Sequence, residues 1–281
     1  MIFLNPGDIA NLHHFLPYPN LALVTSFTDE ELRQVYVKLS VHQNYTQLMF
    51  NASLSSYLFF KFADWMSSLP NLTHLSIVHC SGISTENIDA LCHCLNKVAS
   101  LRYLDLTGLD LGPEGAFYVS VLVRQSNIRS LRLGHNNLQA TGVEHVLDLP
   151  VQLLCIDDNN VHPKHWPGIL NHGSSSLRCI SLAECKFYPD GVVSFGHWIN
   201  SSTNLTRINL CGTANLSGGA LKILCCAMAV HPSLKNVRLS ACGLGDGDAS
   251  PISHLLKKST VLRRLYLQEN SFTIHGQLAF I

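Results

Sequence analysis

The residues of this chain that could do chemistry are mainly cysteines and histidines. The densest group is Cys92-His93-Cys94, with His79 and Cys80 earlier in the sequence. Zinc is the metal that such residues suggest, but its paired ligands are usually separated by two to four residues. On a helix, Cys92 and Cys94 would point about 200° apart. We therefore interpret the group as core cysteines beside a surface histidine.

An oxygen-rich run, Asp157-Asp158-Asn159-Asn160, is the second candidate, because it could coordinate a hard cation. It lacks the alternating ligands and the glycine of a calcium loop. No glycine-rich loop that could cradle a phosphate is present, and no Ser or Cys forms a recognisable catalytic motif with a His and a carboxylate. The sequence therefore predicts a protein that is not an enzyme and that uses neither metal nor cofactor.

The elements that must position any site come from an internal repeat. Each copy reads apolar, two residues, apolar, one, apolar, two, then a small polar or sulfur-containing residue. Eight copies start at Leu72, Leu101, Ile128, Val151, Leu177, Leu205, Leu234 and Leu262, at intervals of 29, 27, 23, 26, 28, 29 and 28 residues. A period of this length is typical of a solenoid.

Within each copy the spacing predicts a short strand, a turn and a helix. The step of two between the second and third apolar residues is strand periodicity. After the turn the period becomes helical, as at Val143, Val146 and Leu147. A small residue closes the strand, and we expect it to pair the buried backbone there, because an Asn side chain both donates and accepts. These slot residues are Cys80, Asn136, Asn159, Cys185, Cys242 and Asn270, while Leu109 and Thr213 depart from the rule.

This pattern resembles the leucine-rich repeat family, specifically its ribonuclease-inhibitor-like class. The resemblance covers roughly residues 45–281. It implies an α/β solenoid in the form of a horseshoe, with a parallel sheet on the concave face and helices on the convex face. Members of the family mostly bind other proteins through the concave surface.

Two weaker copies precede the clear ones. Tyr45, Leu48 and Phe50 keep the phase, so we place one weak and eight clear copies in residues 45–281, the last copy being incomplete. Residues 1–44 are predicted to form an N-terminal capping region with a degenerate repeat at Leu21 and Leu23. A helix is expected from Thr28 to Leu39, opened by a capping box.

Composition restricts the partners and the location of the chain. It has 281 residues, of which 47% are hydrophobic and 14% charged, and a formal net charge of zero. Such a chain has no global field to attract nucleic acid or an anionic membrane. The start Met-Ile-Phe-Leu, with Pro6 and Asp8 following, lacks the features of a signal peptide. We predict a cytoplasmic protein with all ten cysteines reduced, in which the six glycosylation sequons are unused.

Residues that alternate with the inward apolar ones are predicted to face the concave side. The most suggestive group comes from three successive strands and contains three arginines and a tyrosine, which are residue types enriched where binding energy concentrates. The candidate partner-binding residues are Arg207, Asn209, Arg238, Arg264, Tyr266 and Glu269, together with Tyr103, Asp105 and Arg132 nearer the N-terminus. A further basic column would run along one rim, and we interpret it as structural: Arg102, Arg129, Arg178, Lys235 and Arg263.

The predicted function is a non-enzymatic interaction module that holds a protein partner on its concave face as a scaffold, sensor or inhibitor. Two alternatives stay open. One is a regulator of an enzyme in trans, such as a GTPase-activating protein, and the other is the ligand-sensing end of a larger receptor. The copy at Leu262 contains barely one helical turn after Gly276. We therefore expect an open strand edge there and self-association through it, or an incomplete product.

Overall fold

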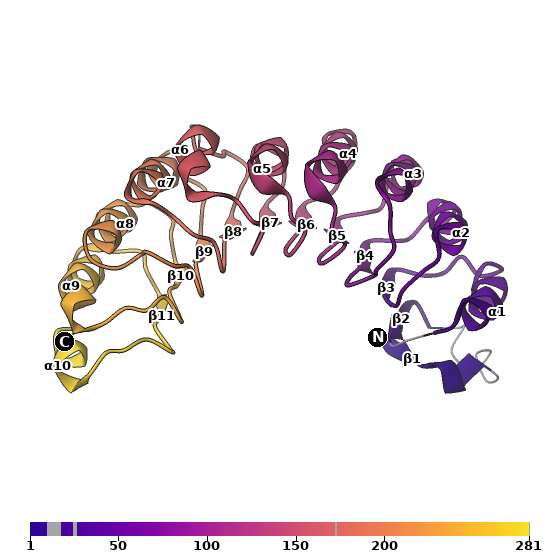
Figure 1. The fold of residues 1–281 in the computed structure, drawn as a ribbon, viewed down its shortest axis with the longest axis horizontal. Helices are drawn as coiled ribbons and strands as arrows, with labels where there is room; N and C mark the ends of the chain where they lie inside the picture. The colour runs from indigo at the N-terminus through magenta and orange to yellow at the C-terminus, as the bar shows by residue number, and fades with distance from the viewer. Residues whose placement is uncertain (10–17, 25–26, 172, 281) are drawn as a thin grey trace. The chain divides into compact units, whose positions relative to one another are not determined.

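The computed structural model describes residues 1–9, 18–24, 27–171 and 173–280. The chain divides into two compact units. The first contains Met1–Asn136 and Leu149–Val151, and the second contains Asn137–Asp148 and Gln152–Ile281. In each unit parallel strands form one layer and helices form the other (Figure 1). The predicted fold class, an α/β solenoid of strand–turn–helix repeats, is confirmed.

The first unit alternates strands and helices, and each of its strands pairs in parallel with the next in the sequence. Its elements are β1 (Ile2–Leu4), β2 (Asn20–Val24), α1 (Asp29–Leu39), β3 (Gln47–Asn51), α2 (Ser56–Ser67), β4 (His74–Ile77), α3 (Thr85–Leu95), β5 (Tyr103–Asp105), α4 (Gly112–Gln125) and β6 (Ser130–Arg132).

The second unit follows the same order, again with parallel pairing between consecutive strands. Its elements are α5 (Gln139–Leu147), β7 (Leu153–Cys155), the 3-10 turn η2 (Pro163–His165), α6 (Trp166–Ile169), β8 (Cys179–Ser181), α7 (Pro189–Ser201), β9 (Arg207–Asn209), α8 (Gly219–Ala229), β10 (Asn236–Arg238), η3 (Asp246–Asp248), α9 (Ala249–Lys258), β11 (Arg264–Tyr266) and α10 (Ile274–Leu278).

The eight clear copies supply strands β4 to β11, and the weak copy at Tyr45 supplies β3. Their phase is correct, since the inward residues are buried: Leu131 and Leu133 are fully buried, and Tyr45 is only 1% exposed. Because side chains alternate along a strand, this burial leaves the residues between them on the outer face of the strand layer. We call this surface the strand face.

The slot residue Asn136 pairs the backbone at the turn, as predicted. Its side-chain oxygen accepts hydrogen bonds from the backbone N–H groups of Leu109 (2.8 Å) and Leu111 (3.5 Å). Its amide nitrogen donates to the carbonyl oxygens of Leu106 (2.7 Å) and Gly134 (3.1 Å). One Asn thus serves four buried backbone groups, of which the Gly134 carbonyl also accepts from the N–H of Gly108 at 2.9 Å.

Other slot residues also form hydrogen bonds with the backbone at the turn. The Cys242 thiol donates to the carbonyls of Leu210 (3.0 Å) and Ser240 (3.4 Å). Thr213, which the repeat rule treats as a departure, donates its hydroxyl to the carbonyl of Leu182 at 3.0 Å. Thr therefore fits the slot because its hydroxyl can donate to the buried carbonyl.

The residue just before the slot has a left-handed backbone in every clear copy. These residues have φ between 45° and 71°, and they are His79, Gly108, His135, Asp158, Glu184, Gly212, Ala241 and Glu269. The N–H groups of most of these residues extend the strand ladder, as when the N–H of Glu184 donates to the carbonyl of Cys211 at 2.8 Å. The turn leads the chain from the strand layer toward the helices. It also sets the side chains of these residues at the carboxyl end of each strand.

Near the N-terminus, the predicted helix is present as α1 and Thr28 is its N-cap. The capping box is complete, because the Thr28 hydroxyl accepts from the N–H of Glu31 and the Glu31 carboxylate accepts from the N–H of Thr28. Leu21 and Leu23 are buried in β2. Strand β1 was not predicted, since three residues are too few for a periodic signal. The domain boundary at residue 44 stays a prediction.

The copy at Val151 has 26 residues before the next one, and its helix, α6, has only four residues. Four buried aromatic rings fill the space beside it. Trp166 stacks on Phe187 at 4.8 Å, Phe187 on Phe195 at 5.6 Å and Phe195 on Trp198 at 5.7 Å between ring centroids. The Trp166 indole N–H also donates to the carbonyl of Lys186 at 2.9 Å. We call these four residues the aromatic stack.

Candidate partner-binding face

The predicted arginines lie together on the strand face of the second unit, but in two rows. The register between β9, β10 and β11 aligns Arg207 with Asn236 and Arg264. Arg238 lies in the next row, aligned with Asn209 and Tyr266. Arg207, Asn236, Arg238, Arg264 and Tyr266 thus form one surface, which we call the arginine patch.

The arginine patch is exposed and its charges are uncompensated. Arg207, Arg238 and Arg264 are all exposed. Within the described part of the chain, none of these three guanidinium groups makes a hydrogen bond or an ion pair. Arg238 does make a cation–π contact, in which its guanidinium carbon lies 5.1 Å from the centre of the Tyr266 ring. The patch therefore offers several N–H donors that are free to bind an external anion.

In the first unit, unlike in the arginine patch, the predicted binding residues Tyr103 and Asp105 form hydrogen bonds within the chain. Tyr103 donates its hydroxyl to the Asp105 carboxylate at 3.1 Å and stacks on His74 at 5.5 Å between ring centroids. Asp105 also accepts from the N–H (3.1 Å) and the hydroxyl (2.6 Å) of Thr107. Its carboxylate thus supports the turn after β5. Arg132 is exposed on β6.

Acidic and amide residues of the second unit form hydrogen bonds within their own repeat and with a neighbouring repeat. The Asp157 carboxylate accepts from the N–H of Ala183 at 2.7 Å and from the Cys155 thiol at 3.1 Å. Asn209 donates to the hydroxyl of Ser181 at 2.8 Å and accepts from the N–H of Cys211 at 3.2 Å. These bonds leave Asn209 less available to a partner than the arginines beside it. Glu269 is exposed at the left-handed turn after β11.

Two arginines of the predicted basic rim donate hydrogen bonds to backbone carbonyls. Arg102 donates to the carbonyls of Ala99 (2.7 Å) and Leu101 (2.9 Å). Arg263 donates to those of Thr260 and Leu262, both at 3.2 Å. These bonds tie the segment before a strand to the strand itself, which agrees with the structural interpretation of the rim.

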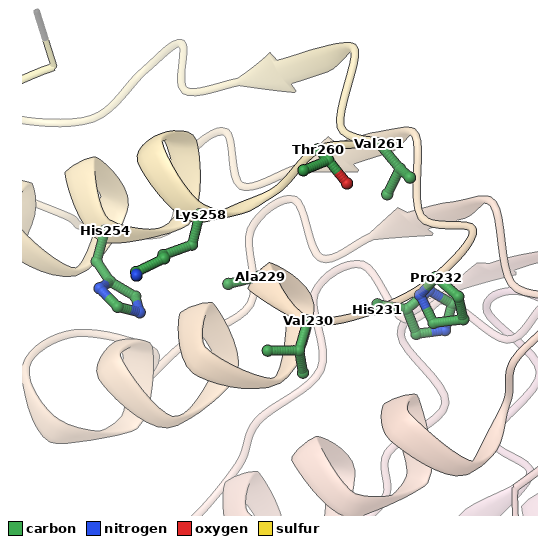
Figure 2. Close-up of a pocket in the computed structure, with 8 residues that line it drawn as sticks. All are labelled: Ala229, Val230, His231, Pro232, His254, Lys258, Thr260 and Val261. Atoms are coloured by element: carbon green, nitrogen blue, oxygen red, sulfur yellow. The ribbon is translucent and has the colours of Figure 1, made fainter.

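A separate cleft of about 540 Å³ lies at the ends of α8 and α9 (Figure 2). Ala229, Val230 and Pro232 line one side, and His254 and Lys258 project from α9 toward it. Its lining contains none of the patch residues. The repeat pattern does not predict this cleft, because segments outside the repeat signature form it.

Buried His231 lines the same cleft and connects two repeats. Its Nδ1 accepts from the N–H of Ser233 at 3.2 Å, so Nε2 carries the proton of the neutral ring and donates to the Ser202 carbonyl at 3.1 Å. Burial lowers the pKa of His231 below the ordinary 6.5, although the bonds to Ser202 and Ile199 partly offset this effect.

This pKa predicts a loss of stability in acid. The unfolded chain takes up a proton near pH 6.5 while the folded ring stays neutral, so the stabilisation is complete above pH 6.5 and decreases as the pH falls toward the folded pKa. We expect the melting temperature to fall more between pH 7.5 and 5.5 in the parent than in a His231→Gln variant. Parallel pH profiles for the two proteins would contradict this assignment.

The geometry supports neither a metal site nor a membrane-spanning helix in the described residues. Among the residues that the structure describes, no three His, Cys, Asp or Glu side chains are grouped as a metal site would need. Cys92 is buried, Cys94 is half-buried and His93 is exposed, so their side chains diverge as expected on a helix. No helix in the described ranges is both long and apolar enough to cross a membrane.

The parallel strands, the slot residues and the helix that returns each copy are the architecture of a leucine-rich repeat solenoid. A family model described as Leucine Rich repeat matches residues 124–146. Among curated proteins, the chain is 25% identical over 205 residues to NACHT, LRR and PYD domains-containing protein 9B of Mus musculus. It is 21% identical over 216 residues to NACHT, LRR and PYD domains-containing protein 13 of Homo sapiens.

These similarities cover 72% and 76% of this chain, but only 17% and 19% of the relatives. The chain thus spans about a fifth of the length of the curated proteins it matches.

Two solved structures share the fold. The leucine-rich repeat-containing protein LegL7 of Legionella pneumophila has a TM-score of 0.58 and 16% identity, and the match covers 98% of this chain and 93% of LegL7. A chain of the yeast Rad7 and Elc1 complex has a TM-score of 0.55 and 14% identity, covering 92% of this chain and 71% of that one.

Proposed function

We propose that this protein is a non-enzymatic interaction module that binds a protein partner through the strand face of its second unit. The observation that carries the proposal is the arginine patch, whose three guanidinium groups are exposed and make no hydrogen bond or ion pair among the described residues. Arg and Tyr are enriched at the centres of protein interfaces, because they combine a large contact area with directional donors. A role as scaffold, sensor or inhibitor would use the same surface.

Site-specific crosslinking tests which face binds. A photoreactive residue at Gln268, which is exposed just after Tyr266, should crosslink a partner protein from a cell extract. The same probe at Lys222 of α8 or Lys257 of α9, both exposed on the helix layer, should not. Crosslinks from the two helix positions alone would move the binding surface to the helices.

We also propose that the protein works in the cytoplasm, since its ten cysteines are free and mostly structural. Burial raises the pKa of Cys92 and Cys225 to about 12 and that of Cys242 to about 11, so these thiols stay protonated. We expect alkylation of the native protein to modify exposed Cys226 first. Alkylation under denaturing conditions without reductant should modify all ten. Two or more consistent disulfides in that measurement would contradict the proposed location.

Similarity to proteins whose names include NACHT, LRR and PYD domains favours a second candidate, in which this module is the ligand-sensing part of a larger receptor. An antibody to the repeats should then detect a native protein well above 31.0 kDa. A native mass near that of the present chain would argue against this candidate. Regulation of a GTPase in trans stays a weaker alternative, which turnover assays with and without the protein would test.

We further propose that the edge strand β11 takes part in self-association. Leu265 of β11 and Leu267 just after it are half-buried, whereas the matching Val237 of β10 and Leu239 just after it are 0% exposed. A sheet edge with exposed apolar residues favours pairing with another chain. Size-exclusion chromatography with light scattering should give a mass above the 31.0 kDa monomer. A concentration-independent monomer would contradict this.

A further inference from the structure

We propose that the arginine patch binds an acidic protein segment, in which Asp or Glu carboxylates of the partner pair with Arg207, Arg238 and Arg264. This inference rests on the proposed function, because it specifies the chemistry of the partner that the strand face would hold.

The geometry of the patch suits a group of carboxylates. Arg207 and Arg264 lie on either side of Asn236, two strand spacings or about 9.6 Å apart. Arg238 lies on the central strand, about 7 Å further along. The three cations therefore form a triangle in which each guanidinium has room for its own bidentate carboxylate. Asn236 is half-buried and makes no side-chain hydrogen bond with the described residues, so its amide adds a donor at the middle of one side.

The electrostatics of the patch also favour an external anion. Three positive charges lie within about a Debye length of each other, with no carboxylate within ion-pair distance among the described residues. Tyr266 holds the Arg238 guanidinium over its ring, which fixes one cation while leaving the edges of the fork free. A partner carboxylate would lower the mutual repulsion and gain charge-assisted hydrogen bonds.

A protein segment fits this surface better than a nucleic acid. The turns that follow the strands carry exposed Glu184 and Glu269, which would repel a long phosphate backbone. The net charge of the whole chain is zero, so it has no extended field to concentrate a polyanion. A short acidic segment can contact the arginines without crossing the acidic turns.

The test uses the full chain and fluorescence anisotropy with a labelled octaglutamate peptide. We expect it to bind the parent with a salt-dependent affinity, and octaglutamine not to bind. A variant with Arg207→Gln, Arg238→Gln and Arg264→Gln should bind at least about tenfold more weakly, a loss typical of removed charge pairs. The matched control, Lys222→Gln with Lys257→Gln and Lys258→Gln, removes the same charge from exposed positions of α8 and α9. It should stay within about twofold of the parent, as expected for charges outside the interface.

Three results would overturn the inference: no binding of octaglutamate, equal losses in the two variants, or tighter binding of an eight-nucleotide oligothymidylate than of octaglutamate. Octaglutamate should also compete with the partner that crosslinks from Gln268. If that crosslink forms but octaglutamate neither binds nor competes, the strand face still binds a partner and only its acidic chemistry is wrong. If the crosslink is absent as well, the proposed function itself fails.

Discussion

Replacing Phe195 by alanine should lower the free energy of unfolding by about 3–5 kcal/mol, the range measured for buried Phe-to-Ala changes. Phe195 is 0% exposed and stacks between Phe187 and Trp198. Its removal would open a cavity in the aromatic stack beside the short helix α6. The helix cannot close that space, because it has only four residues. Urea denaturation followed by circular dichroism would measure the change.

Phe60→Ala is the matched control, since Phe60 lies on α2 and is 43% exposed. We expect it to cost less than about 1 kcal/mol, as for most exposed positions. Similar losses for the two variants would mean that the aromatic stack does not support the repeat around α6.

Asn136→Ala should have the next largest effect, a loss of about 3 kcal/mol, because a buried group left unpaired costs roughly 1–3 kcal/mol. The change removes the bonds that Asn136 makes to the N–H groups of Leu109 and Leu111 and to the carbonyl of Leu106, while the Gly134 carbonyl keeps its bond from the N–H of Gly108. Thermal and urea unfolding of the variant would show the loss directly.

Asn44→Ala provides the comparison, because Asn44 is exposed and makes no side-chain hydrogen bond with the described residues. It should change stability by less than about 0.5 kcal/mol. An Asn136 variant as stable as the Asn44 variant would show that the turn finds other partners, such as water, and that the slot does not stabilise the repeat.

The sequence predicted the strands best where apolar residues recur at a fixed spacing. Copies at Leu72 through Leu262 predicted eight strands correctly, because their apolar residues must face one core. The left-handed turn was not recognised. Its residues include His, Asp, Glu, Ala and Gly, so only their common position before the slot could have indicated it. Trp166, which packs where α6 is short, lies outside the repeat signature and could be placed only by the tertiary structure.

The sequence predicted that the three arginines share a face, but not how they are arranged on it. Spacing within the repeat indicated that Arg207, Arg238 and Arg264 share a face, and the strand register separates them into two rows. The intramolecular roles of Asp105 and Asn209 depend on contacts with residues two positions on, which the alternation rule does not consider. Glu269, Tyr103 and Arg132 stay predictions as partner contacts.

Charge reversal in the arginine patch tests most directly whether a protein partner binds there. A triple variant with Arg207→Glu, Arg238→Glu and Arg264→Glu should lose capture of the crosslinked partner while its far-UV circular dichroism stays unchanged. The same reversal at Lys222, Lys257 and Lys258 on the helix layer should leave capture intact. Capture by the arginine variant at the level of the parent, with the fold unchanged, would contradict the account and place the binding surface elsewhere.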